Sequence, residues 1–304
     1  MNLDLTDEQR MIRDVARDFA EREVRPIASE IDRDARFPHE TIKRMGELGL
    51  MGIMIPEKWG GAGGDAVSYA VAMEEIARVC GSHAVVMSVN NSLFCDPIYK
   101  YGSDAQREKF LKPVAGGHEI GCFALTEPQA GSDATNQHTL AVRDGDHYVV
   151  NGRKVFITNG REASVALVLV QTDQAKGSHG ISALLIEKSR PGFLVPKCEE
   201  KLGIRASDTA EFVFEDCRVP VANRLGDEGH GFKIAMASLD GGRIGIAAQA
   251  LGLAVGAYER ALAYARERKS FGVIIGQHRW CSGCWRTWRW PSRARACSSG
   301  RRRA

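Results

Sequence analysis

Four side chains near the end of the chain have the types and the spacing of a metal site. His278, Cys281, Cys284 and Cys297 follow the pattern H-x2-C-x2-C-x12-C, and imidazole and thiolate are the ligands that structural zinc sites use. The surrounding stretch, residues 276–304, also holds four of the five tryptophans, eight arginines and no acidic residue. Arginine and tryptophan together can bind RNA through charge and base stacking. A zinc or nucleic-acid site is therefore one interpretation of this stretch.

A frameshift is a second interpretation of residues 276–304. Tryptophan has a single codon, which restricts how the stretch can be reread, and permitted codons still allow an amphipathic helix when residues 278–298 are read two bases later. The chain before residue 276 has five more acidic than basic residues, so it offers no general basic surface for nucleic acid. We favour the frameshift and expect neither a metal site nor nucleic-acid binding.

A glycine-rich stretch at residues 56–65, PEKWGGAGGD, could in principle cradle a phosphate. It lacks the Lys-Ser/Thr pair of a P-loop, so we predict a loop between helices. No run of 18 apolar residues predicts a membrane span. The cysteines before residue 276 have no paired spacing, and the first residues lack the pattern of a signal peptide, which favours a cytoplasmic location.

The elements that must position any site follow from the periodicity of the sequence. Residues 1–118 carry amphipathic helical patterns, among them a capping-box pattern at Thr6 and Gln9. This segment is predicted to be an all-α domain. Residues 227–275 return to a helical pattern rich in alanine and glycine, which predicts the start of a C-terminal helical bundle. The pattern stops where the tail, residues 276–304, begins.

Between the two helical segments, residues 119–226 contain short β-rich runs parted by glycine, proline and charged turns. Asn151-Gly152 lies between two such runs and is the commonest two-residue hairpin turn. The segment is predicted to be a β-barrel-like domain. The predicted fold class is therefore α+β with several domains.

One motif in the β segment carries a family resemblance. GCFALTEPQAGSDATN, residues 121–136, resembles the flavin-binding signature of the acyl-CoA dehydrogenases, from which only Asn136 departs. Family-like segments follow in the family's order: KVFITNG at 154–160, LDGGR at 239–243 and ARERKSFG at 265–272. The resemblance covers residues 1 to about 275 and is closest to the short-chain, butyryl-CoA branch. It implies the acyl-CoA dehydrogenase fold with a truncated C-terminal bundle.

The resemblance implies FAD as the cofactor. An isoalloxazine ring must be held by hydrogen bonds at its polar edge while one face stays open to substrate, and a threonine hydroxyl with the backbone of a glycine-containing turn can supply those bonds. The implied cofactor-binding residues are Phe123, Ala124, Leu125, Thr126, Ser132, Phe156, Ile157, Thr158 and Arg268. The arginine would reach the FAD diphosphate of a neighbouring subunit, to which a guanidinium binds well.

The resemblance also implies contacts with an acyl-CoA substrate. The implied substrate-binding residues are Ser132, Asp240, Gly241, Gly242 and Arg243. Arg243 stands among glycine, isoleucine and alanine, where an unpaired charge would be costly. We therefore expect it to have a partner or a ligand.

The implied reaction is α,β-dehydrogenation of a short-chain acyl-CoA to the trans-2-enoyl-CoA. A carboxylate removes the α-proton while the β-hydrogen passes to FAD as a hydride, so the family needs a glutamate of raised pKa and hydrogen bonds to the thioester carbonyl. In most branches this glutamate lies farther along the C-terminal domain. In a minority it immediately precedes the arginine of the LDGGR segment, where this chain has Gly242. We therefore expect no catalytic base in this chain and little activity, and a non-catalytic flavoprotein remnant is the alternative.

The resemblance further implies two kinds of partner. Electron-transferring flavoprotein is the family's usual electron acceptor. The intact family forms homotetramers through its C-terminal bundles, and we expect this assembly to be impaired here, because most of the bundle pattern is missing.

Overall fold

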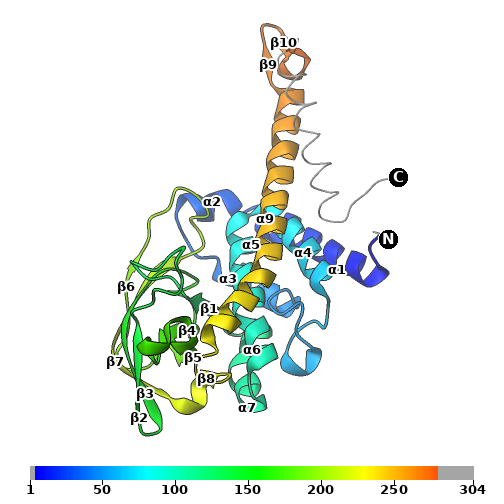
Figure 1. Ribbon diagram of the computed structural model, residues 1–304. Helices are drawn as coiled ribbons and strands as arrows, with labels where there is room; N and C mark the ends of the chain where they lie inside the picture. Colours follow the sequence, from blue (N-terminus) through cyan, green and yellow to red (C-terminus); the bar gives the residue numbers. More distant parts are fainter. Residues whose placement is uncertain (1–3, 280–304) are drawn as a thin grey trace.

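The computed structural model describes residues 4–279, and its N-terminal part is helical as predicted (Figure 1). The capping box is confirmed, because the Thr6 hydroxyl accepts a hydrogen bond from the Gln9 amide while the Gln9 side chain accepts one from the Thr6 amide. The helices and helical turns of this part are α1 (Asp7–Phe19), η1 (Ala20–Val24), α2 (Ala28–Arg33), α3 (His39–Glu47), η2 (Glu57–Trp59), α4 (Ala66–Val79), α5 (Gly81–Ser88), η3 (Val89–Cys95), α6 (Asp96–Tyr101), α7 (Asp104–Gln106), η4 (Arg107–Leu111) and α8 (Lys112–Ala115).

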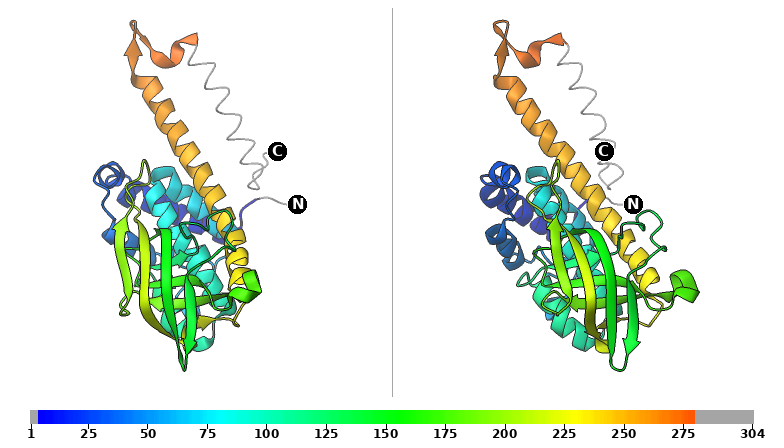
Figure 2. Two further views of the ribbon diagram at one scale, coloured as in Figure 1. Left: turned by 60° about the vertical axis from the view of Figure 1, so that its left-hand side comes forward. Right: turned by 90° about the vertical axis from the view of Figure 1, so that its left-hand side faces the viewer.

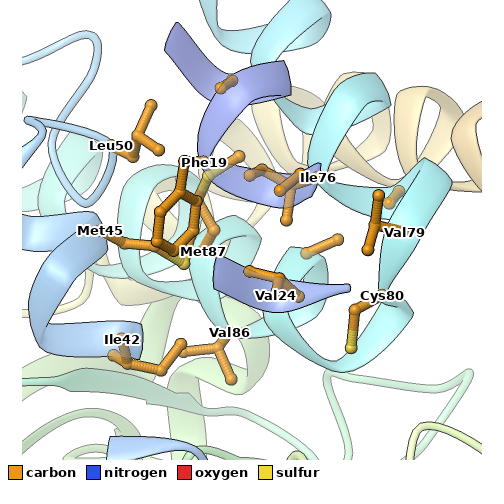
Figure 3. Packing of buried hydrophobic residues seen from close by; sticks show 14 of the residues in the cluster. Phe19, Val24, Ile42, Met45, Leu50, Ile76, Val79, Cys80, Val86 and Met87 are labelled. Atoms are coloured by element: carbon orange, nitrogen blue, oxygen red, sulfur yellow. The ribbon is translucent and has the colours of Figure 1, made fainter. Parts of the chain in front are cut away.

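The core of the helical part gathers side chains from helices that are distant in sequence. Figure 3 shows Phe19 of α1 among Met45 of α3, Ile76 of α4 and Met87 of α5, all of them buried. Sequence periodicity did not single out the stretch from α5 to α6. Nearly every side chain there is buried, and a helix that is buried all round has no polar face to reveal its period.

The middle part is a β-sheet whose strands include every β-rich run that the sequence indicated. Its strand order is β6-β7-β3-β2-β4-β5-β8, and β1 pairs with β4 in parallel. A single residue pair, Leu140 with Gln171, joins β2 to β4, so the sheet is nearly divided into two. The strands are β1 (Gly121–Ala124), β2 (Leu140–Asp144), β3 (His147–Thr158), β4 (Val165–Gln171), β5 (Ile181–Glu187), β6 (Phe193–Cys198), β7 (Thr209–Pro220) and β8 (Arg224–Leu225); the turns η5 (Gln174–Gly180) and η6 (Val221–Asn223) lie between them.

The predicted hairpin turn at Asn151-Gly152 is wrong. Strand β3 runs straight through it, and the β2–β3 hairpin turns instead at Gly145-Asp146, because Asp144 pairs with His147. Gly152 has a φ of +150° at a register shift in the β3–β7 ladder, and a β-carbon there would lie 2.6 Å from the Cα of Thr139. A glycine in a strand can mark a bulge or a close backbone approach as well as a turn, and here it marks both.

Helix α9 (Gly231–Glu267) is 37 residues long, or about 55 Å at 1.5 Å per residue. The helix lies against the body as far as Glu259, which pairs with Arg78, and its last turns project beyond the body, as Figures 1 and 2 show. The helix is followed by β9 (Lys269–Ser270), β10 (Val273–Ile274) and η7 (Ile275–Gln277). None of the helices between residues 4 and 279 has the length and apolar character needed to cross a membrane.

Glycines let α9 approach the helical part closely. Gly242, Gly245, Gly252 and Gly256 are all buried on one side of the helix. A β-carbon at Gly252 would lie 2.7 Å from Ala77 Cβ and 3.0 Å from the Arg78 amide nitrogen, both of α4. This small-residue helix thus packs closely against the helical part.

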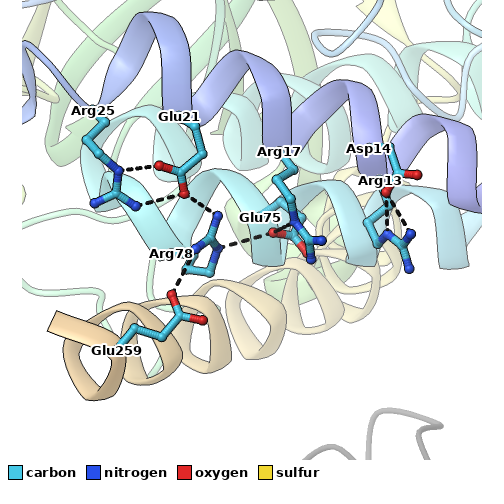
Figure 4. A network of polar contacts seen from close by, with 8 residues as sticks. All are labelled: Arg13, Asp14, Arg17, Glu21, Arg25, Glu75, Arg78 and Glu259. Carbon is cyan, nitrogen blue, oxygen red and sulfur yellow. Dashed lines mark hydrogen bonds and ion pairs between the residues drawn. The ribbon is translucent and has the colours of Figure 1, made fainter. Parts of the chain in front are cut away.

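A charged cluster fastens α9 to α1 and α4 (Figure 4). Arg78, whose side chain is only 13% exposed, donates to Glu75 at 3.2 Å, to Glu259 of α9 at 2.8 Å and also to Glu21. Glu75 is almost fully buried and accepts a second, bidentate pair of bonds from Arg17. Because the Arg78 and Arg25 guanidiniums both donate to Glu21, the pKa of that carboxyl falls to about 2.

The glycine-rich stretch at 56–65 forms the predicted loop between helices. It begins with the turn η2 and then packs tightly, since a β-carbon at Gly61 would collide with the backbone oxygens of Ile55 and Gly52. Its glycines are explained by this close packing.

Candidate functional site

The motif at 121–136 and the segment at 154–160 lie side by side. The motif begins on β1 and leaves it after Ala124, and the amide of Val155 donates to the carbonyl oxygen of Thr126 at 2.9 Å. The β3–β7 ladder shifts register between Lys154 and Ile157, so Val155 and Phe156 form a bulge opposite the motif. The two predicted flavin segments are thus brought together by a backbone hydrogen bond.

Phe156 adopts an unusual conformation in this bulge. Its φ is +59°, in the left-handed region, and its ring is 63% exposed. A bulky residue with positive φ is strained, and such strain is concentrated at functional sites. The bulge therefore holds an apolar ring outside the core at some cost in stability.

The other predicted flavin residues divide into a buried set and an accessible set. Phe123, Ala124 and Ile157 are buried, Leu125 and Thr158 are half-buried, and Ser132 is exposed. Within residues 4–279, no hydrogen bond is recorded for the side-chain hydroxyls of Thr126, Ser132 and Thr158, and none of these side chains is fully buried. A polar ligand edge could therefore bond to them without breaking an internal bond.

A buried ion pair beside the bulge was missed by sequence reasoning. Lys154 is fully buried, and its ammonium lies 2.7 Å from the Glu127 carboxylate, which is 2% exposed. Burial lowers the pKa of Lys154 to about 8, against the opposing effect of Glu127. The Lys154 charge and the bonds from the His138 and Thr139 amides hold the pKa of Glu127 below its usual range, although burial raises it. Both groups are therefore ionised at neutral pH.

Four of the five predicted substrate residues, Asp240, Gly241, Gly242 and Arg243, lie together on the first half of α9, whereas Ser132 lies in the loop after β1. Asp240 and Arg243 form an ion pair with each other, one turn apart. The expectation that Arg243 has a partner is confirmed, but its supposed apolar surroundings are wrong, since the Asp240 and Arg243 side chains are 70% and 74% exposed.

The two glycines of the LDGGR segment face different surroundings. A β-carbon at Gly241 would meet nothing within 4 Å, whereas one at Gly242 would lie 3.1 Å from Leu93 and 3.7 Å from the Ser92 hydroxyl. Gly242 is therefore packed against η3, and no carboxylate stands at that position.

Arg268 lies apart from the other predicted flavin residues. It follows the last residue of α9, 28 residues after Asp240, which is about 40 Å along the helix. Within one chain it therefore cannot share a site with Asp240.

The alternative zinc site lies largely outside the described residues. Of its four residues, only His278 is described, and Cys281, Cys284 and Cys297 lie outside the described residues, as does most of the stretch read as a frameshift. Among the residues that are described, no group of three or more His, Cys, Asp or Glu side chains could hold a metal.

Sequence comparisons give consistent matches along the chain. The profile "Acyl-CoA dehydrogenase, N-terminal domain" matches residues 6–118, the middle-domain profile matches 122–217 and the C-terminal-domain profile matches 229–285. The short-chain-specific acyl-CoA dehydrogenase of Clostridium acetobutylicum is 54% identical over 90% of this chain and 72% of its own length. The mitochondrial short-chain-specific enzyme of Mus musculus is 50% identical over 90% of this chain and 66% of its own length.

Solved structures agree in fold. Butyryl-CoA dehydrogenase from Megasphaera elsdenii superposes with a TM-score of 0.93 at 43% identity, over 97% of this chain and 78% of that one. A chain from a study entitled "Electron transferring flavoprotein of Acidaminococcus fermentans: Towards a mechanism of flavin-based electron bifurcation" gives 0.95 at 46% identity, over 97% and 77%. This chain belongs to the acyl-CoA dehydrogenase family, whose members are FAD-dependent oxidoreductases.

Proposed function

We propose that this chain binds FAD at the β3 bulge and oxidises a short-chain acyl-CoA thioester at its α and β carbons. The named short-chain enzymes among its relatives support the substrate class. The observation that carries the proposal is the pairing of two features, the strained, exposed Phe156 and the hydroxyls of Thr126 and Thr158, which have no recorded internal partners. Together they offer an apolar face and a hydrogen-bonding edge, which is what an isoalloxazine ring requires.

In this mechanism the protein binds and orients two ligands. Thr126, Thr158 and the backbone of the motif would hold the polar edge of the flavin by hydrogen bonds, and Phe156 would supply an apolar contact for its ring. Ser132 and the Asp240–Arg243 pair contact the acyl-CoA, with the exposed guanidinium available to an anionic or carbonyl group of the thioester. FAD supplies the hydride acceptor when it is bound.

We further propose that residue 242 does not supply the base that removes the α-proton. A glycine has no proton-accepting side chain, and a β-carbon at this position would already crowd the Leu93 side chain, which would lie 3.1 Å from it. In most branches of the family the base lies farther along the C-terminal domain, so we propose that proton abstraction falls to a group outside residues 4–279. A chain without such a group would react slowly. The loss of a general base costs about 100- to 10,000-fold in rate.

Two partner proposals follow from the family. Electron-transferring flavoprotein takes the electrons from the reduced cofactor. In an intact homotetramer of the family, Arg268, remote from Asp240 in its own chain, would serve the FAD diphosphate of a neighbouring copy, and we expect this assembly to be impaired in the present chain. The projecting end of α9 exposes Tyr264, and the β9–β10 turn beyond it exposes Phe271, which supports a contact between copies at this end in such an assembly.

Anaerobic titration tests the function. The purified chain is expected to take up FAD and to show a perturbed flavin spectrum with butyryl-CoA, and a smaller change with palmitoyl-CoA. Bleaching by butyryl-CoA is expected to be about 100- to 10,000-fold slower than in the clostridial relative. A chain that takes up no FAD would overturn the proposal, whereas bleaching as fast as in the relative would overturn only the argument about the base.

A further inference from the structure

The Glu127 carboxylate lies at the centre of the loop that carries the flavin motif. Besides Lys154, it accepts hydrogen bonds from the amide of His138 at 2.6 Å, the amide of Thr139 at 3.1 Å and the Gln129 side chain at 2.7 Å. These donors lie on both arms of the loop from 127 to 139. A single buried carboxylate thus holds the two arms together.

The Lys154 ammonium connects this loop to β3. Its three bonds go to the Leu125 carbonyl oxygen at 3.1 Å, to Glu127 at 2.7 Å and to the Gln137 side chain at 3.2 Å. All three N–H donors of the ammonium are therefore used. The next residue of the strand, Val155, donates its amide to Thr126 and precedes Phe156.

Stability alone does not explain a charged pair at this place. Taking two charges out of water costs several kcal/mol per ion, and a well-packed apolar pair is often as stable or more so. What an apolar pair cannot supply is a set of directed bonds to the Leu125 carbonyl and the His138 and Thr139 amides. The function of the pair must therefore be sought in the geometry that it imposes.

We propose that Lys154 and Glu127 are positioning residues for the FAD site, and that they hold Thr126 and Phe156 at the separation that receives the isoalloxazine ring. This inference rests on the proposed function, because FAD is the ligand of that site. Neither side chain touches the ligand. Both act through the Leu125-Thr126 backbone and the β3 bulge.

The decisive variant replaces both charges at once, Lys154→Met with Glu127→Gln. It leaves no unpaired buried charge, so the fold is expected to keep its thermal midpoint without FAD. Its dissociation constant for FAD is expected to rise about ten- to hundredfold, the range found when the supporting partners of metal ligands are removed, and its flavin circular dichroism is expected to change. Arg153→Met on the same strand is the matched control, since Arg153 is exposed and pairs with Glu211.

Two single variants separate charge from packing. Lys154→Arg keeps a cationic donor and is expected to recover most of the FAD affinity, whereas Lys154→Met leaves Glu127 buried and unpaired and is expected to lose affinity and stability together. A double variant with the FAD affinity and circular dichroism of the unsubstituted chain would overturn the positioning role.

Amide hydrogen exchange without FAD keeps this test separate from the proposed function. In the double variant the amides of Val155 and Thr139 are expected to exchange faster, while the Tyr148 amide in the β2–β3 ladder stays protected. If the unsubstituted chain binds no FAD, the proposed function fails, and a loosened Val155 amide still supports the positioning of the loop. Unchanged exchange at Val155 and Thr139 would overturn it.

Discussion

Replacing Gly252 by alanine tests whether the close approach of the α9 and α4 backbones stabilises the packing of α9 on the helical part. The added methyl group would lie 2.7 Å from Ala77 Cβ and 3.0 Å from the Arg78 amide nitrogen, and closer still to the Glu74 carbonyl oxygen. Carbon atoms in contact lie about 3.5–4.0 Å apart. The two helices would therefore have to separate by about 1 Å.

Two effects oppose each other in this variant. Alanine is favoured over glycine inside a helix by about 1 kcal/mol, whereas overpacking a closely packed contact costs about 1–3 kcal/mol. Gly241→Ala on the same helix gains the helix propensity of alanine without the overpacking cost, because its methyl group would meet nothing within 4 Å. The difference between the two variants therefore isolates the packing cost, and we expect Gly252→Ala to be less stable than Gly241→Ala by about 1–3 kcal/mol.

Urea unfolding of both variants, followed by circular dichroism, measures this difference. Gly241→Ala is expected to unfold at a higher urea concentration than the unsubstituted chain, and Gly252→Ala at a lower one than Gly241→Ala. Equal stabilisation by the two substitutions would refute the reasoning, because it would mean that α9 can leave α4 at no cost.

Three further outcomes are expected. Phe156→Gly relieves a left-handed conformation and should leave stability unchanged or raise it by about 1 kcal/mol, while FAD affinity measured by fluorescence falls; a loss of stability would contradict the strain argument. Arg78→Met leaves Glu75 buried with fewer partners and should cost about 2 kcal/mol in thermal unfolding, less than the 3–5 kcal/mol of a fully broken buried pair; adding Glu75→Gln should recover part of it. Lys154 has a pKa of about 8 when folded and about 10.4 when unfolded, so the unfolded state binds more protons between these values. Relative to Lys154→Arg, the unfolding free energy of the parent should therefore rise by up to about 3 kcal/mol from pH 8 to pH 10.4, and a flat difference would show that the folded pKa is not lowered.

Sequence patterns predicted much of the fold where an element is determined by residues that are close together in the sequence. The capping box at Thr6 and the apolar run from 165 to 171 gave a helix start and a buried strand where the structure has them. Asn151-Gly152 was misleading because its glycine allows a close approach to Thr139, the loop residue before β2, and such a contact between segments leaves no trace in the local sequence. A conformation that tertiary contacts impose cannot be read from a dipeptide.

The candidate site was predicted only in part for the same reason. The order of the motifs predicted that Thr126 and Phe156 belong to one site, and the structure brings their segments together through the bond from the Val155 amide to the Thr126 carbonyl oxygen. Nothing in the sequence distinguished Lys154 from the other charged residues of the strands, and charged residues are rarely buried. Its partner Glu127 is 27 residues away in the sequence, and only the tertiary structure brings the two side chains together.

The packing of α9 against α4 also determines the position of its C-terminal end. If the helix pivots at Gly242, Gly256 lies about 21 Å away and Arg268 about 39 Å away along the same axis. If Gly256 moves about 1 Å away from α4, rotation of the rigid helix about Gly242 therefore displaces Arg268 by about 2 Å. A hydrogen bond of about 2.9 Å does not survive such a displacement. The glycines buried against α4 therefore determine the position of the Arg268 guanidinium, although Arg268 lies about 18 Å beyond Gly256 along the helix.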